Sequence, residues 1–474
     1  MRNCSFFSVW NAYSHLYREA NWQVLPAPSK IDDVDWDRPC GRCAQMKAFK
    51  RDSLAVKMLW ASGSYGMIMV LRFCSSVIIA RLLAPELVGV MVIVNSVRMG
   101  VELLTDVGIE QNIVRSKRGD EREFFNTAWT IQVLRGVLLT ALFSSISPLI
   151  SKVYGIDSRI FFFISAAPLI TGLGSTSIFL LVKNLRVRER NVFELKVELL
   201  NFFIAITIIF IWPTIWSLVA ATLSSLAIRA GLSYSLPHPK HRFCLDRSSM
   251  NEIVSFGKWT MATSLVSFSA ANLDKIYLGT VVSLSIMGVF GIARSISDLP
   301  GTLASRIGYQ VIFPAAAASG KANSELSRLR LLLVCVAAVA IGTVVNWADL
   351  AINTLYGSNY KDGGKILQIL LFGAWFSVLS SFSEATLLGR GRAAAITFAN
   401  IFRLLGMLVT IPVGFSLYGL TGALYGIVAS EFLRFVALAI FEIAAAGVTD
   451  LVISIAATAL MAVTITTWTF LRTV

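Results

Sequence analysis

The sequence predicts an all-α integral membrane protein with about 12 core transmembrane helices. The chain has 474 residues, of which only 15% are charged, and a mean hydropathy of +0.69. Soluble globular proteins carry roughly 25% charged residues. The apolar residues come in blocks long enough to cross a bilayer, which takes about 20 residues of helix. Because backbone groups in lipid must be hydrogen-bonded within their own segment, we expect these blocks to be helices.

Twelve apolar blocks follow a polar tail of residues 1–52, and a thirteenth lies near the C-terminus. The expected spans are 54–80, 86–108, 126–150, 159–182, 195–212, 214–236, 253–272, 283–309, 328–348, 364–388, 394–416 and 419–442, with the extra block at 450–471. The tail lacks the apolar region and cleavage site of a signal peptide, and we expect residues 1–45 to be dispensable or an upstream mis-start. Its lone CxxC motif, Cys40 to Cys43, lacks the two further ligands that zinc needs, so no metal is expected.

Lys and Arg residues are distributed unevenly between the two alternating sets of loops. One set contains 16 of them and the other contains six. The larger set consists of Arg115, Lys117, Arg118, Arg122, Lys183, Arg186, Arg188, Arg190, Lys240, Arg242, Arg247, Lys321, Arg328, Arg330, Arg390 and Arg392. Because cytoplasmic loops are enriched in Lys and Arg, we expect this set and the N-terminus to face the cytoplasm. Topology also explains the net charge of +14 without a nucleic-acid partner.

Several features of the sequence recur about 200 residues apart. At offsets of 199 to 205 residues, Tyr154-Gly155 recurs as Tyr356-Gly357, Gly89 as Gly288, and Arg229 as Arg434. Transporters often contain repeats, and an even number of helices per repeat gives two parallel halves. We therefore expect two six-helix bundles related by pseudo-twofold symmetry, at residues 53–236 and 253–443. A cytoplasmic linker at 237–252 would join them, and an extra apolar segment at 444–474 would follow.

Several stretches of the sequence resemble a known family. The stretch from Ile79 to Glu86, IARLLAPE, followed by Gly89, is similar to the ARLLxPExxG signature of the polysaccharide transporter family. The similarity continues at Leu104–Ile109, Phe125–Gly136, Phe256–Trp259, Leu273–Gly279, Gly288 and Ile312–Pro314. Over about residues 46 to 440, the chain is thereby identified as a member of the oligosaccharide flippases. These belong to the MOP superfamily, which also contains the multidrug exporters (MATE) and the lipid II flippase.

The resemblance implies a function in exopolysaccharide or lipopolysaccharide synthesis. Members of the family flip undecaprenyl-diphosphate-linked oligosaccharide repeat units from the cytoplasmic to the periplasmic leaflet. We expect this chain to do so in the bacterial inner membrane, by alternating access through a cationic central cavity. Expected partners are the lipid-linked oligosaccharide, membrane lipids, a polysaccharide polymerase and chain-length proteins. Two alternatives stay open: a multidrug-type small-molecule antiporter, and a non-transporting scaffold of a polysaccharide synthase complex.

Ionisable residues inside the expected spans are costly unless they face a cavity or a partner. The candidates for binding the diphosphate and acidic sugars are Arg72, Arg98, Arg135, Arg294 and Arg403. Their planar guanidinium groups match phosphate and carboxylate oxygens. Arg72 has no acidic residue within four positions, and Arg135 and Arg403 have none within seven. We therefore expect these three to face a shared aqueous path.

The other intramembrane charges form an expected coupling or charge network. Its members are Glu102, Asp106, Asp274, Asp298, Glu384, Glu431 and Arg434. Mutual neutralisation on one helix face is the alternative for Arg98 with Glu102, Arg294 with Asp298, and Glu431 with Arg434. Asp106, Asp274 and Glu384 have no cation three or four positions away, although Lys275 adjoins Asp274. They are the candidates for exchanging H⁺ or Na⁺, and no other cofactor is expected.

We expect no enzymatic activity. The sequence has no P-loop motif, and no loop between spans exceeds about 16 residues, so there is no room for an extramembrane catalytic domain. His15, His238 and His241 lie in the tail or a loop, outside any triad or metal arrangement.

Overall fold

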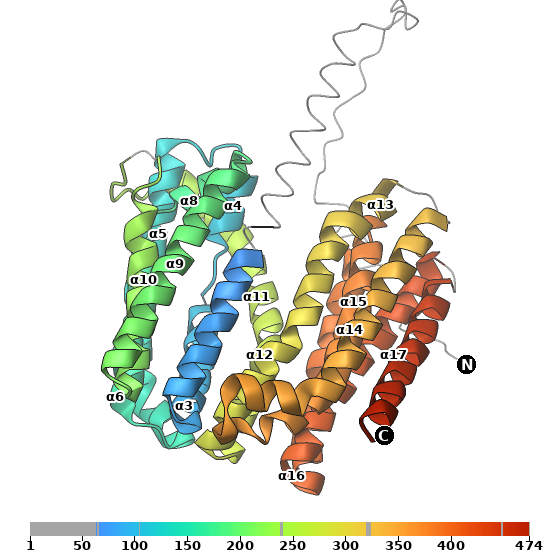
Figure 1. Ribbon diagram of the computed structural model, residues 1–474. Coiled ribbons are helices and arrows are strands. Elements are labelled where there is room, and N and C mark those ends of the chain that lie inside the picture. The colour runs from blue at the N-terminus through green and yellow to red at the C-terminus, as the bar shows by residue number, and fades with distance from the viewer. Residues whose placement is uncertain are drawn as a thin grey trace, which may run out of the picture. The chain divides into compact units, whose positions relative to one another are not determined.

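The computed structural model describes residues 66–103, 105–237, 240–318, 324–446 and 449–473, together with Gly63. These residues form α-helices with one short π-helix and one 3-10 helix, and they contain no β-strand (Figure 1). The predicted all-α fold class is confirmed. The predictions for the N-terminal tail, its CxxC motif and the start of the first span lie outside the described residues.

The helices are joined by short connections. Residues 66–82 are helical. They are followed by α3 (Pro85–Leu103), α4 (Ile109–Arg115), α5 (Arg122–Tyr154), α6 (Ser158–Ile164), α7 (Ala167–Gly172), α8 (Ser177–Lys183), α9 (Val187–Ile211) and α10 (Ile215–Ser233). The second part contains α11 (Arg247–Val281), α12 (Leu284–Ile307), η1 (Gly308–Ile312), α13 (Phe313–Ala318), α14 (Ser324–Tyr356), η2 (Ser358–Tyr360), α15 (Gly363–Gly389), α16 (Ala393–Ala446) and α17 (Thr449–Thr473).

Five of the described helices are long and apolar enough to cross a membrane. They are α5, α10, α15, Leu326–Tyr356 of α14 and Leu451–Thr469 of α17. A sixth span results if α6–α7 and α8, bent by 53°, count as one. The charge-bearing helices α3, α11 and α12 are not among them. The protein is a multi-pass membrane protein, but the predicted number of 12 or 13 spans is not confirmed.

The segment predicted as a span at 159–182 is broken into α6, α7 and α8. Pro168 lies in the first turn of α7, where its missing N–H removes no helical hydrogen bond. Gln132 of α5 reaches the break, and its Nε2 donates to the carbonyl oxygens of Gly172 and Gly174 at 3.0 Å each. A side chain of a neighbouring helix thereby satisfies backbone groups that the break leaves open.

A second break divides α16 into two helices. Tyr418 and Gly419 have non-helical backbone angles, and the φ of 59° and ψ of −143° at Gly419 suit glycine alone. Beyond the break the chain runs back along itself, since Thr410 Oγ1 donates to the carbonyl oxygen of Gly426 at 2.8 Å. The break falls at the turn predicted between the spans 394–416 and 419–442.

The helices α3 and α12 meet through two glycines. A Cβ atom on Gly89 would collide with the backbone oxygen of Leu284, and one on Gly288 with that of Pro85. The two backbones are therefore in direct contact. Gly89 and Gly288 lie 199 residues apart and are one of the pairs from which the internal repeat is predicted. The division into two bundles stays a prediction.

The linker before α11 is held on α5 by hydrogen bonds from its backbone N–H groups to side chains of α5. The N–H groups of Arg242, Cys244 and Asp246 donate to Asn126 Oδ1, Thr130 Oγ1 and Thr127 Oγ1 at 3.1 to 3.2 Å. Asp246 also caps α11, and the hydrogen bonds it accepts from Ser249 lower the pKa of its carboxyl group. The start of α11 is thereby fixed relative to α5.

Candidate substrate-binding cavity

A cavity of about 480 Å³ lies between α12, α15, α16 and Ala271 of α11. Its charged lining residues are Arg294, Asp298, Arg306, Glu384, Arg403, Glu431 and Arg434. The rest of the lining is small or hydroxylated and includes Gly301, Gly373, Ser297, Ser377 and Ser381. Small side chains leave space between the helices, and the serine hydroxyls can donate to or accept from a ligand.

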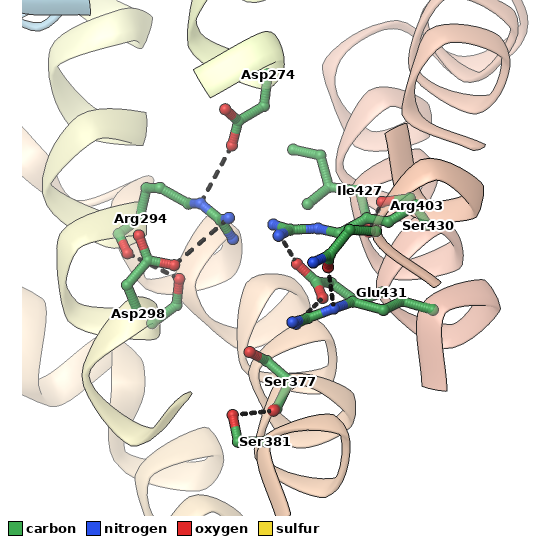
Figure 2. Close-up of polar contacts among 12 residues, drawn as sticks. Asp274, Arg294, Asp298, Ser377, Ser381, Arg403, Ile427, Ser430 and Glu431 are labelled. Atoms are coloured by element: carbon green, nitrogen blue, oxygen red, sulfur yellow. Dashed lines mark hydrogen bonds and ion pairs between the residues drawn. The ribbon is translucent and has the colours of Figure 1, made fainter. Parts of the chain in front are cut away.

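On one side of the cavity, Arg294 of α12 is held between two aspartates. Its Nε lies 3.1 Å from Oδ2 of Asp274 in α11, and its Nη2 lies 3.4 Å from Oδ1 of Asp298 (Figure 2). The Asp274 side chain is fully buried, whereas that of Asp298 is 49% exposed. Asp274 therefore supports Arg294 from the protein interior, and Asp298 pairs with it at the cavity surface.

On the other side, two arginines of α16 pair with two glutamates. Arg403 Nη2 lies 2.5 Å from Glu431 Oε1, which the break in α16 brings opposite it. Arg434 pairs with Glu384 of α15, and its Nε donates to Asn400 Oδ1 at 3.0 Å. The predicted pair of Glu431 with Arg434 is present at 3.9 Å, but Glu384 is the closer partner of Arg434.

The side chains of Arg294 and Arg403 extend toward each other from opposite walls (Figure 2). Like charges repel, so two guanidinium groups that share one space favour an anion between them. Each guanidinium group offers several N–H donors in one plane, which suits phosphate or carboxylate oxygens. The arrangement can therefore bind an anion with oxygen atoms directed to both walls.

The lining of this cavity has a small excess of positive charge. Among the described residues, four arginines line the cavity together with three carboxylates. Asp274, which does not line it, pairs with Arg294 from behind. The arginines therefore hold internal counter-ions, and the cationic cavity stays a prediction.

Arg98, Glu102, Asp106 and Arg135 lie elsewhere, and three of them line a separate pocket of about 250 Å³. Arg98 forms the predicted i, i+4 pair with Glu102 at 2.6 Å. Arg135 Nε donates to Thr105 Oγ1 at 3.0 Å, and its Nη2 donates to the carbonyl oxygen of Glu102. Asp106 accepts hydrogen bonds from the N–H of Gly108 and the hydroxyl of Ser264.

Arg72 does not lie at either pocket. Its side chain is 67% exposed, and its Nε lies 3.0 Å from Glu198 Oε1 of α9. Neither of these two pockets contains all three of Arg72, Arg135 and Arg403, and a path shared by them stays a prediction.

Sequence reasoning missed a buried ion pair beside the cavity. Arg330, which the charge pattern counts with the loop residues, lies in α14 with 1% exposure and pairs with Glu442 of α16 through two contacts, one of them 3.2 Å. Ser383 of α15 donates to the same carboxylate at 2.7 Å. The polar start of α14 resembles a loop in sequence, and no short-range spacing links residues 112 positions apart.

The fold is similar to that of solved MOP transporters. The lipid II flippase MurJ, in an inward closed conformation, matches with a TM-score of 0.69 at 14% identity, over 85% of this chain and 92% of MurJ. An inward-facing multidrug resistance transporter of the MATE family in the MOP superfamily matches with a TM-score of 0.59 at 15% identity, over 83% of this chain and 95% of that one. The chain has the fold of a MOP-superfamily membrane transporter.

Sequence comparison identifies the family. Residues 78–365, more than half of the chain, match the family described as Polysaccharide biosynthesis protein, and the chain belongs to it. It is 24% identical over 301 residues to the teichuronic acid biosynthesis protein TuaB of Bacillus subtilis strain 168, covering 62% of each chain. It is 21% identical over 352 residues to the succinoglycan biosynthesis transport protein ExoT of Rhizobium meliloti strain 1021, covering 73% of this chain and 70% of ExoT. The chain thus spans less than two thirds of TuaB.

Proposed function

We propose that this protein flips undecaprenyl-diphosphate-linked oligosaccharide repeat units from the cytoplasmic to the periplasmic leaflet of a bacterial inner membrane. The observation that carries the proposal is the pair Arg294 and Arg403, which extend into one cavity from α12 and α16 (Figure 2). The diphosphate of the carrier lipid is the group that binds between them. The protein performs no covalent chemistry, its N-terminus lies in the cytoplasm, and a polymerase and chain-length proteins receive the product.

The chemistry of the cavity supports a diphosphate ligand. A diphosphate carries several negative charges on oxygens that can reach both walls, and arginine binds such oxygens in a bidentate manner. Interactions between charges are stronger in the low-dielectric interior of a membrane protein than in water. A multidrug-type antiporter for cationic compounds needs a cavity dominated by acids, and here four arginines line the cavity together with three carboxylates. A scaffold needs no cavity with converging arginines.

Substitution of the two facing arginines tests the proposal. Arg294→Gln and Arg403→Gln remove the charge but keep hydrogen-bonding capacity, and each should lower export of the cell-surface polysaccharide by about tenfold or more. Lysine at either position should restore export only in part, because it offers a point charge instead of a planar fork. Polymer export and membrane abundance are measured together in a strain that lacks the native gene.

Arg229→Gln is the matched control. Arg229 also pairs with a glutamate, Glu194 at 2.6 Å, but it lies outside this cavity. Its replacement should leave export unchanged. Normal export by both cavity variants, or loss of export explained by missing protein alone, would contradict the proposal.

A further inference from the structure

Two arginines that line the cavity are already paired with carboxylates of the protein itself. These carboxylates occupy the positions that the oxygen atoms of a bound substrate would take. Arg403 is paired with Glu431 and Arg434 with Glu384. Both glutamates are buried, with 3% and 8% exposure, yet both line the cavity. An anion that enters the cavity must therefore compete with these carboxylates for the guanidinium groups.

We propose that Glu384 and Glu431 are built-in counter-ions that determine the charge of the accepted substrate. The inference rests on the proposed function and adds a rule of selectivity. An entering anion takes Arg403 and Arg434 from the two glutamates, and only an anion with at least two negative charges does so effectively. The glutamates are thereby specificity-determining residues, and Asp274 is a positioning residue that keeps Arg294 in place from behind.

The energetic argument follows from burial. When one guanidinium group turns to a ligand, its former carboxylate is left unpaired in a low dielectric, which is strongly unfavourable. A monoanion replaces one guanidinium–carboxylate ion pair, and its attraction to the guanidinium group is no stronger than that of the carboxylate it displaces. A dianion replaces the contacts of both Arg403 and Arg434, and it also gains attraction from Arg294 on the opposite wall. The internal ion pairs therefore keep the affinity of the cavity for singly charged anions low.

Several charged and titratable groups surround the two glutamates. Glu384 faces Arg434 of α16, and Tyr309 of η1 is close enough to respond to the charges of both. Arg306 of α12 lines the same cavity. On the far side of α15, the neighbouring Ser383 contacts the Arg330–Glu442 pair, which lies outside the cavity lining.

Glu431 faces a different set of groups. They are Arg403 and Arg434 of α16, and Arg294 and Asp298 of α12.

Two simple anions provide the test. Methanedisulfonate carries two negative charges and methanesulfonate carries one, and both stay ionised across the pH range used. The purified full chain in detergent micelles is titrated with each, and affinity is obtained from the ligand-induced rise of the thermal unfolding midpoint. The wild-type protein should bind the dianion at least about tenfold more tightly than the monoanion.

Glu384→Gln and Glu431→Gln remove the competing charge. Each should raise the affinity for the monoanion by about tenfold. Glu194→Gln is the control, because Glu194 forms a pair with Arg229 at 2.6 and 2.8 Å away from the cavity. It should leave the affinities for both anions unchanged.

The outcomes separate this inference from the proposed function. If Arg294→Gln and Arg403→Gln weaken dianion binding, but the wild-type protein shows no preference for the dianion over the monoanion, the counter-ion proposal is overturned alone. The wild-type series decides this point even if a glutamate variant fails to fold. If the arginine variants leave dianion binding unchanged, the cavity is not the anion site and the proposed function fails with it.

Discussion

Buried charges in this protein are stabilised by partners that lie far away in the sequence. Arg403 with Glu431, Arg434 with Glu384, and Arg330 with Glu442 each join different helical segments. Removing one member of a buried pair leaves an uncompensated charge, which costs far more than the pair itself contributes. These residues therefore fix how α14, α15 and α16 pack.

The Arg330–Glu442 pair offers a direct test of this principle. Glu442→Gln should lower the free energy of unfolding by about 3 to 5 kcal/mol, because Arg330 stays buried without its counter-charge. The double variant Arg330→Met with Glu442→Leu should recover most of the loss, since no charge is left buried. Thermal unfolding of the purified protein, followed by size-exclusion chromatography, measures both. A single variant as stable as the wild type would show that the pair is not structurally important.

Local spacing predicted three of the ion pairs correctly. Arg98 with Glu102 and Arg294 with Asp298 are each four residues apart on one helix, and they pair at 2.6 and 3.4 Å. The third is Glu431 with Arg434, at 3.9 Å. The partner of Arg72, in contrast, is 126 residues away in α9. An arginine that has no acidic residue nearby in the sequence can therefore still have an acidic partner, because the fold brings distant helices together.

At the scale of elements, the sequence predicted apolar helices well and their interruptions poorly. The turn at Gly419 was predicted because the apolar blocks end on either side of it. The break between α7 and α8 was not, because its polar backbone groups are satisfied by Gln132 on another helix. The π-helix η1, which directly follows α12 beside the cavity, also has no signal in hydropathy.

The glycine contact between α3 and α12 should be essential for packing. Gly89→Ala places a Cβ atom against the backbone oxygen of Leu284, and a backbone atom cannot rotate away as a side chain can. We expect a loss of about 1 to 3 kcal/mol in stability and lower membrane abundance. Both are measured by thermal unfolding and quantitative immunoblotting.

Gly231→Ala is the control for this prediction. Gly231 lies in α10, and a Cβ atom there meets nothing within 4 Å. Alanine at this position should be neutral or slightly stabilising, because it has the higher helix propensity. Equal behaviour of the two variants would contradict the view that the α3–α12 contact is close-packed.

At the scale of the whole molecule, the family signature and composition predicted the class of protein, and the comparisons confirm it. The positions of the charged groups could not be predicted in the same way. The twelve predicted site residues separate into a cavity lined by α12, α15 and α16, a pocket at α3 and α5, and the exposed Arg72. A linear sequence shows that a charge is buried in a span, but not which helix face meets which neighbour.

The orientation of the chain is a prediction that reporter fusions can test. The excess of basic residues in one set of loops predicts that fusions after residue 118 or 188 report the cytoplasm. Fusions after residue 157 or 358 should report the periplasm. Alkaline phosphatase and green fluorescent protein fusions give opposite signals on the two sides. The reverse pattern would invert the direction of transport that we propose.

The central claim is that a diphosphate-linked lipid crosses the membrane through the cavity between Arg294 and Arg403. The most direct measurement uses the purified full chain in liposomes that contain a fluorescent undecaprenyl-diphosphate oligosaccharide, with a membrane-impermeant quencher that reports its arrival in the outer leaflet. The wild-type protein should accelerate flipping well above protein-free liposomes. The double variant Arg294→Gln with Arg403→Gln should be slower by about tenfold or more, at equal reconstituted protein. Flipping by the double variant at the wild-type rate, or no acceleration by the wild type, would contradict the account.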